Sequence, residues 1–165
     1  MGKGILERAA AFAAYRHRHQ FRRDGVTPYV EHPKAVMAIL RDEFGVDDLE
    51  VLAAGLLHDT IEDTATDYDA IAEEFGPRVA DLVAALTKDK RLPEGRRERE
   101  YFAQLSRAPL SAKFCKVADT LHNIRDTDST LRPKAHRKGR KLLGTFRGIK
   151  ALAGPLAILK EEMEK

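Results

Sequence analysis

Apolar residues recur at helical spacing in one segment after another, and this pattern most constrains the fold of the chain. An Ala-rich segment near the N-terminus repeats them at three- and four-residue intervals, which predicts a helix over about residues 4–22. No stretch alternates apolar and polar residues long enough to predict a convincing strand, although residues 24–31 could form a short β-hairpin or extended piece. The sequence therefore predicts an all-α fold.

Glycine, proline and aspartate residues divide the rest of the chain into further helices. We expect these helices to run from about Pro33 to Phe44, from Asp47 or Asp48 to Leu57, from Thr66 to Phe75, from Pro77 to Leu86, from Pro109 through Asp119, over residues 134–152 and over residues 155–164. Gly154-Pro155 is the expected break between the last two. Residues 88–100 are almost wholly charged, which predicts an exposed loop that leads into a polar helix and could form a mobile lid.

The composition is that of an ordinary globular protein. With 165 residues, of which 43% are hydrophobic and 33% charged, residues 1–165 are expected to form a single domain. The only cysteine, Cys115, excludes an internal disulfide and favours a reducing, cytoplasmic location. The longest apolar stretches fall far short of the ~20 residues that a membrane span needs. We therefore expect no membrane partner, whereas the sequence makes no prediction of the oligomeric state.

The net charge is only +3, but the positive charges are unevenly placed. Residues 132–150 carry many lysines and arginines and not one acid. Such a stretch is either a solvated helix face or a surface that attracts a polyanion, such as a small nucleotide or a nucleic acid. Only Phe146 adds an aromatic ring there, which makes nucleic acid the less favoured partner.

Two histidines and two aspartates form a candidate metal site. His32 lies near an expected helix N-terminus, His58-Asp59 ends an apolar run, and Asp119 lies on an amphipathic helix. A mixed nitrogen and oxygen shell suits a divalent transition metal better than calcium or a structural zinc ion. The alternative for His58-Asp59 is a helix C-terminus with a polar turn, but polar groups at the end of a buried helix are costly without partners.

Further polar residues stand close to these candidates in the sequence. Glu62 and Asp63 follow His58-Asp59 directly, where a carboxylate could orient or deprotonate a water activated by the metal. Asp119, His122 and Asn123 share one helix face, which suits a metal ligand beside a substrate-orienting group. Ordinary surface polarity is the alternative for His122 and Asn123.

Taken in order, these motifs resemble the hydrolase domain of the RelA/SpoT-homologue family, and most of all its small stand-alone alarmone hydrolases, which belong to the HD-domain superfamily. The matching stretches are residues 17–23 (HRHQFRR), 28–33 (PYVEHP), 56–64 (LLHDTIEDT), 75–80, 86–88 (LTK) and 116–125 (KVADTLHNIR). They cover about residues 10–126, and no motif matches beyond about residue 130. The resemblance implies a single compact HD-type helical bundle.

The resemblance also implies removal of the 3′-pyrophosphate from guanosine tetra- and pentaphosphate with one divalent metal, usually Mn²⁺. The residues that match the metal ligands are His32, His58, Asp59 and Asp119. Glu62 and Asp63 match the catalytic acids that act on the attacking water. The residues that match substrate contacts are Arg22, which stacks on the guanine, Tyr29, Lys88 and Asn123. The implied partner is thus a small anionic nucleotide.

Two positions depart from the family pattern. His19 replaces a usual glycine, and Thr120 stands where a basic residue commonly follows the metal-binding aspartate. The loss of a cation leaves room for an HD phosphohydrolase that acts on another phosphorylated nucleotide, such as NADPH. A non-catalytic nucleotide- or nucleic-acid-binding protein is a third reading, but it predicts damaged ligands or acids, and all of them are present.

Overall fold

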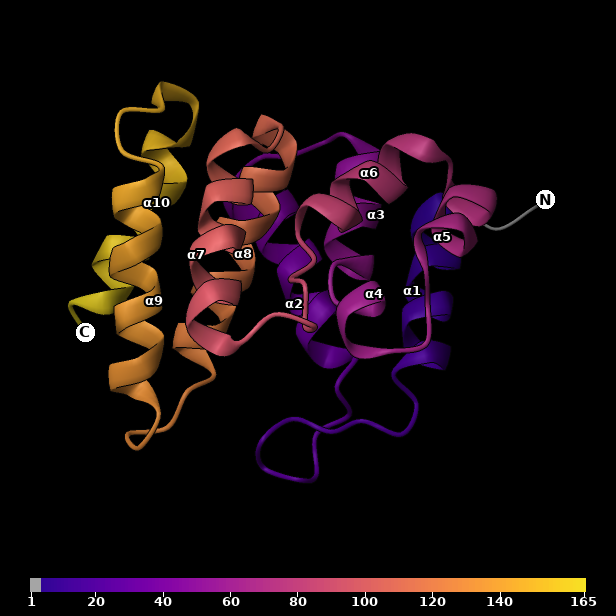
Figure 1. Cartoon of the computed structure of the whole chain (residues 1–165), viewed down its shortest axis with the longest axis horizontal. Helices are drawn as coiled ribbons and strands as arrows, with labels where there is room; N and C mark the ends of the chain where they lie inside the picture. The colour runs from indigo at the N-terminus through magenta and orange to yellow at the C-terminus, as the bar shows by residue number, and fades with distance from the viewer. Residues whose placement is uncertain (1–3) are drawn as a thin grey trace.

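The computed structural model describes residues 4–165, which form helices joined by short loops (Figure 1). The helices are α1 (Ile5–Arg16), α2 (Glu31–Ala38), the π-helical turn η1 (Ile39–Glu43), α3 (Leu49–Leu57), α4 (Thr60–Asp63), α5 (Tyr68–Phe75), α6 (Pro77–Ala85), α7 (Glu94–Arg107), α8 (Leu110–Arg125), α9 (Arg132–Thr145), the 3-10 turn η2 (Lys150–Leu152) and α10 (Ala153–Met163). The all-α prediction is confirmed. No helix in this part of the chain is long and apolar enough to cross a membrane.

Helix α3 lies at the centre of the fold. It packs against α1, α2, α6 and α8, and every residue from Val51 to Leu57 is buried. Asp48 begins the helix, because its side chain accepts hydrogen bonds from the backbone N–H groups of Glu50 and Val51. A helix that is apolar on all sides has to be surrounded by others. Its C-terminus is therefore fixed inside the protein, directly before His58.

Gly55 lies in α3 at its closest approach to α2 and η1. A Cβ atom added there would stand 2.7 Å from Cδ1 of Leu40 and 3.7 Å from Cα of Met37. Leu40 is fully buried, so it has little room to move away. The absence of a side chain thus lets α3 lie close against the helix that carries His32.

The first helix is shorter than predicted. It ends at Arg16, not near residue 22, because His17 turns inward and bonds the side chain of Gln20, which brings the chain out of the helix. The following loop is closed by one antiparallel bridge between Phe21 and Pro28. The extended piece predicted for residues 24–31 is therefore reduced to this bridge.

Two other boundaries differ from the prediction. Helix α7 begins at Glu94, so only the first half of residues 88–100 is a loop. The break near the C-terminus lies at residues 146–149, where Gly148 has a φ of 81°, and not at Gly154-Pro155. Pro155 instead lies in the first turn of α10, where backbone N–H groups have no partner within the helix, so proline costs no hydrogen bond there.

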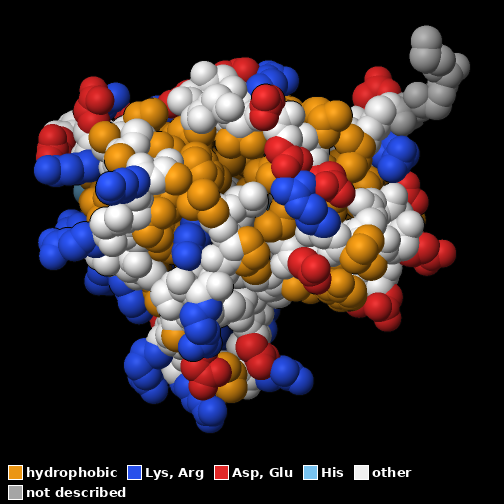
Figure 2. All heavy atoms as spheres, turned by 90° about the horizontal axis from the view of Figure 1, so that it is seen from above, with side chains coloured by type: hydrophobic (Ala, Val, Ile, Leu, Met, Phe, Trp, Pro, Cys, Tyr) orange, Lys and Arg blue, Asp and Glu red, His pale blue; other side chains and the backbone are white. Residues whose placement is uncertain are grey.

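Helices α9 and α10 pack against α8 and form the end of the molecule away from the N-terminus (Figure 1). Lys and Arg side chains are denser at this end of the surface (Figure 2). The basic stretch of the sequence is thus placed on a helix that lies beside α8, which carries Asp119.

Candidate active site

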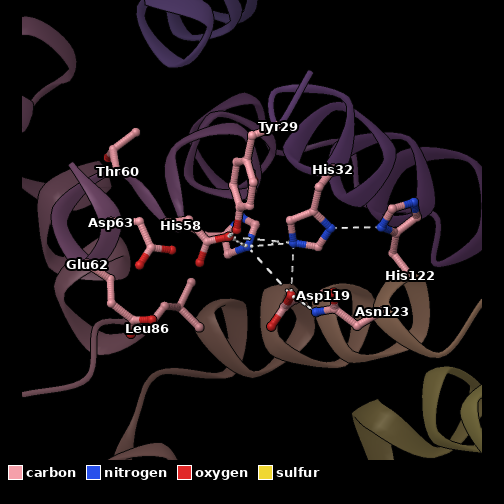
Figure 3. Close-up of polar contacts among 12 residues, drawn as sticks. Tyr29, His32, His58, Thr60, Glu62, Asp63, Leu86, Asp119, His122 and Asn123 are labelled. Carbon is pink, nitrogen blue, oxygen red and sulfur yellow. Dashed lines mark hydrogen bonds and ion pairs between the residues drawn. The ribbon is translucent and has the colours of Figure 1, made fainter. Parts of the chain in front are cut away.

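The four predicted metal ligands converge in the interior (Figure 3). Nε2 of His32 lies 3.2 Å from Nε2 of His58 and 3.1 Å from Oδ1 of Asp119. Oδ2 of Asp59 lies 2.9 Å from Nε2 of His58. His32, His58 and Asp59 each offer one ligand atom within 4.8 Å of the others, which is the geometry of a metal-binding group.

Hydrogen bonds fix the orientation of these side chains. Nδ1 of His58 lies 2.8 Å from the backbone oxygen of Gly55, which can only accept, so this nitrogen donates and Nε2 is the nitrogen left for a metal once it has lost its proton. The carboxylate of Asp119 accepts a hydrogen bond at Oδ1 from Nδ2 of Asn123 and one at Oδ2 from Nζ of Lys116. Nε2 of His58 and the two carboxylates therefore face a common centre, where a cation can take the place of the histidine proton.

The charges of this cluster shift its pKa values. Burial alone would lower the pKa of His58, but the carboxylates of Asp59 and Asp119 outweigh it and raise that pKa well above 6.5. Burial would likewise raise the pKa of Asp119, but Lys116 and the two imidazoles hold it well below its usual range. Both shifts favour the charged forms, so the site holds ionised carboxylates at neutral pH. Together with the HD-type motif, this donor set indicates a divalent metal.

Tyr29 and the preceding loop support the cluster from one side. The hydroxyl of Tyr29 donates to Oδ2 of Asp59 over 2.6 Å, and its ring lies against that of His17, with the ring centres 4.8 Å apart. Gln20 donates through Nε2 to the backbone oxygen of Asp63 over 2.6 Å. The structure thus places Tyr29 against a predicted ligand, and His17 and Gln20 tie this loop to α4.

Glu62 and Asp63 lie on the short helix α4, beside the predicted ligands. One ligand atom from each and one from Asp59 lie within 4.8 Å of one another. Burial raises the pKa of Glu62, although the backbone N–H of Lys88 bonds its Oε1 at 2.7 Å and opposes the rise. Asp63 accepts from Nζ of Lys90 over 2.6 Å. The two acids therefore differ in environment, since Glu62 accepts from a backbone N–H and Asp63 pairs with a lysine.

Arg22 and Asn123 meet beside Asp119, to which Asn123 is also bonded. Nη2 of Arg22 donates to Oδ1 of Asn123 over 3.1 Å and to Oδ2 of Asp126 over 2.7 Å. The guanidinium carbon lies 5.6 Å from the centre of the Tyr29 ring. Arg22 and Asn123, two of the residues predicted to contact the nucleotide, are thus brought together. Asp126 also holds the arginine, a contact that was not predicted from the sequence.

A pocket of about 330 Å³ joins these groups. This volume falls in the range of small-molecule sites. It is lined by Phe21, Arg22, Arg23, Tyr29, His32, His58, Asp59, Glu62, Asp63, Leu86, Lys88, Glu98, Tyr101, Phe102, Lys116, Asp119, Thr120, Asn123, Ala135, Lys138 and Leu142. All ten residues singled out as ligands, acids or substrate contacts are among them.

Lys138 in α9 also lines this pocket, although the sequence reading did not single it out. Desolvation by the pocket wall and the nearby charge of Lys88 lower the pKa of Lys138. The pocket therefore presents three lysines, Lys88, Lys116 and Lys138, near the neutral Thr120. The signal in the sequence was the spacing of Lys134, Lys138 and Lys141, which places them on one face of a helix.

His122 was left open between a functional and a surface role. It does not line the pocket, but Nδ1 of His122 lies 2.7 Å from Nδ1 of His32. Desolvation, with the charges of His32 and Arg22, lowers the pKa of His122 to about 4. Its ring is therefore neutral at ordinary pH and contacts a predicted ligand, so His122 is not simply a solvent-facing polar residue.

Comparison with known proteins agrees with this geometry. The sequence matches the family described as HD domain over residues 9–156. It is 47% identical over 123 residues to the guanosine-3′,5′-bis(diphosphate) 3′-pyrophosphohydrolase MESH1 of Mus musculus, covering 74% of this chain and 68% of that protein. The MESH1 of Danio rerio is 36% identical over 164 residues, covering 98% of this chain and 91% of that protein.

A solved structure gives the same result. It is described as a metazoan ortholog of SpoT that hydrolyzes ppGpp, and it superposes with a TM-score of 0.88 at 31% identity. The match covers 99% of this chain and 96% of that one, so it includes α9 and α10 as well as the motif-bearing helices. The chain therefore belongs to the HD domain family and, within it, to the RelA/SpoT-homologue hydrolases.

Proposed function

We propose that this protein is a metal-dependent hydrolase that removes the 3′-pyrophosphate from guanosine tetra- and pentaphosphate. The products are guanosine di- or triphosphate and pyrophosphate. The observation that carries the proposal is one pocket in which the α4 acids lie on one side of the metal-type cluster and Asn123, with Arg22 bonded to it, lies on the other (Figure 3). The names of the relatives support the same substrate.

One divalent cation, which we propose to be Mn²⁺, would be held by Nε2 of His32, Nε2 of His58 and the carboxylates of Asp59 and Asp119. These residues fit such an ion because Nδ1 of His58 is engaged by a backbone oxygen and the nitrogens and carboxylates face one another. When bound, the ion lowers the pKa of a water molecule and polarises a phosphoryl oxygen. The two carboxylates suit manganese, and the two imidazoles suit a first-row transition metal.

Glu62 and Asp63 act on the attacking water. A raised pKa brings the carboxylate of Glu62 closer to the operating pH, which improves a general base. The water attacks the phosphorus next to the ribose 3′-oxygen, the bond between phosphorus and this oxygen breaks, and the oxygen leaves as a hydroxyl after it takes a proton from solvent. Glu62 accepts the proton of the water, and Asp63, held by Lys90, orients the same molecule.

The rest of the pocket binds the nucleotide. The flat guanidinium of Arg22, held by Asn123 and Asp126, stacks on the guanine, while Tyr29 and Asn123 border the same end. Lys88 and Lys138 neutralise the phosphates. Lys138 supplies from α9 the positive charge that Thr120 does not. We place the enzyme in the cytoplasm, which its buried free thiol at Cys115 supports.

A second candidate is a phosphohydrolase for another nucleotide such as NADPH, which the neutral Thr120 in the pocket wall favours. A substrate panel with Mn²⁺ separates the two. Guanosine tetraphosphate, NADPH and common nucleotides are each incubated with the enzyme, with and without chelator, and the products are identified. We expect pyrophosphate and guanosine diphosphate from the alarmone. Release of single phosphate from NADPH, with no pyrophosphate from the alarmone, would reject the leading proposal.

A further inference from the structure

The ring of His32 is engaged at both of its nitrogens (Figure 3). Nε2 faces the metal-type cluster, 3.1 Å from Oδ1 of Asp119, and Nδ1 lies 2.7 Å from Nδ1 of His122. The two rings lie with their centres 4.9 Å apart and their planes tilted by 36°. The His32 side chain is only 1% exposed, so the His122 contact is not replaced by bulk water.

The contact between two Nδ1 atoms has only two arrangements. A neutral imidazole carries one N–H and one lone pair, so one Nδ1 donates and the other accepts. If His32 accepts, its proton stands on Nε2 and blocks the metal side. If His32 donates, Nε2 has a free lone pair and the proton of His122 stands on its own Nε2. Only the second arrangement is compatible with a ligand role for His32.

We infer that His122 is a positioning residue that accepts the Nδ1 proton of His32 and so holds the tautomer and ring angle in which His32 binds the metal. The inference rests on the proposed metal site. His58 receives the same support from the fixed backbone oxygen of Gly55, whereas His32 depends on a replaceable side chain. Helix α8 therefore supplies the Asp119 carboxylate and also, one turn later, the orientation of an imidazole from α2.

Two substitutions separate this role from general packing. Oδ1 of asparagine can occupy the place of the histidine Nδ1, whereas leucine has a similar shape and no acceptor. His122→Leu should weaken Mn²⁺ binding by about 10–100-fold, as loss of a partner behind a ligand histidine usually does. His122→Asn should bind far more tightly than His122→Leu. His136→Leu, which removes a histidine of α9 outside the pocket, is the control.

Free Mn²⁺ measured by electron paramagnetic resonance gives the affinity without any substrate. Because His122 does not line the pocket, the KM for nucleotide at saturating Mn²⁺ should be unchanged in His122→Leu. Wild-type affinity in His122→Leu, or equal losses in the leucine and asparagine variants, would overturn the inference. If the Mn²⁺ affinities of the variants follow the expected order but neither the variants nor the wild type cleave the alarmone, the proposed substrate is rejected and the role of His122 is retained.

Nitrogen-15 nuclear magnetic resonance spectra of the zinc-loaded wild-type protein report the tautomers of His32 and His122 directly. This test needs no substitution. The expected signature is a proton on Nδ1 of His32 and on Nε2 of His122. A proton on Nδ1 of His122 in the loaded protein would contradict the assignment. Failure of the wild-type protein to bind any divalent ion would overturn this inference and the proposed metal mechanism together.

Discussion

Lys116 and Asp119 lie one turn apart on α8, and Nζ of the lysine stands 2.7 Å from Oδ2 of the aspartate. Burial would lower the pKa of Lys116, but the charge of Asp119 outweighs it and raises that pKa. The pair keeps the carboxylate ionised and leaves its other oxygen facing His32. Oδ2 of Asp119 is thus paired with Lys116, and Oδ1 remains available to a cation.

Lys116→Met should therefore destabilise the metal-free protein by about 3 kcal/mol, because it leaves a buried carboxylate without its main partner. Mn²⁺ should restore part of this loss, since the ion supplies positive charge to the same carboxylate. Thermal unfolding with chelator and with Mn²⁺ measures both effects. Lys113→Met, on the same helix but over the Phe146 ring, is the matched control. Equal losses in the two variants would show that the ion pair contributes nothing.

Glu62→Gln should lower kcat by about 10²–10⁴-fold, the usual range for loss of a general base. The amide keeps the shape of the side chain but cannot accept the proton of the water. The Kd for Mn²⁺ should remain close to that of the wild type. Steady-state rates and metal titration check the two statements, with Glu74→Gln in α5 as a control, because Glu74 pairs with Arg8 on the surface and does not line the pocket. Wild-type turnover in Glu62→Gln would assign this acid to structure.

Arg22→Ala should raise the KM for guanosine tetraphosphate, because a cation stacked on a ring contributes roughly 0.5–2 kcal/mol. Metal binding should be unaffected. Arg18→Ala is a close control, since the guanidinium carbon of Arg18 lies 4.1 Å from the centre of the Tyr15 ring but outside the pocket. The comparison is made from kcat and KM at saturating Mn²⁺. A higher Kd for Mn²⁺ in Arg22→Ala would mean that this arginine supports the metal site instead.

Lys138→Met should raise the KM by roughly tenfold, since a hydrogen bond to a charged group contributes about 1.5–3 kcal/mol. The loss should shrink as salt is added, because salt screens charges that solvent can reach. Lys134→Met removes an equal charge one turn earlier, outside the pocket. If both variants lose the same affinity, α9 acts only through its overall charge.

Metal binding should release a proton at neutral pH. The raised pKa of His58 means that its ring is protonated in the metal-free protein, whereas a ligand histidine has to be neutral. Mn²⁺ affinity should accordingly rise with pH until that proton is lost. Calorimetry in buffers of different ionisation enthalpy counts the released proton. An enthalpy that is the same in every buffer would contradict the prediction.

The same shift affects the stability of the metal-free fold. Because the folded pKa lies above the ordinary value of 6.5, the proton on His58 stabilises the fold. This contribution is complete below about pH 6.5 and disappears as pH rises through the folded pKa. The Tm of the wild type, measured with chelator, should therefore fall as pH rises above neutral. The Tm of His58→Gln should depend less on pH over the same range.

The sequence predicted the helices and the residues that gather in the pocket better than it predicted where the chain turns. Asp48 and Pro77 are local signals, so the starts of α3 and α6 followed from them. The end of α1 at Arg16 depends on the inward turn of His17 and its bond to Gln20. The pair Gly154-Pro155 predicts a helix break from its own sequence, but the break lies before η2 and the pair lies after it. These outcomes are decided by tertiary contacts that a local pattern does not contain.

The same distinction applies to the site. His58-Asp59 and Glu62-Asp63 are neighbours in sequence, and their roles were predicted from motifs. Lys138 reaches the pocket only because α9 packs on α8, and His122 contacts His32 only because α2 and α8 lie side by side. The spacing of such residues gives the helix face on which they lie, but not the element that this face contacts.

Gly55 makes the spacing between two ligands a property of the hydrophobic interior. The missing methyl group allows α2 and α3 to approach, and His32 and His58 lie on these two segments, 3.2 Å apart at Nε2. An alanine there would meet Leu40, which is fully buried, so we expect the two helices to move apart and the distance between the imidazoles to increase, while every ligand stays in the sequence. Metal preference in this chain can consequently drift through apolar substitutions that never touch the ion, and a comparison of ligand residues alone would not detect it.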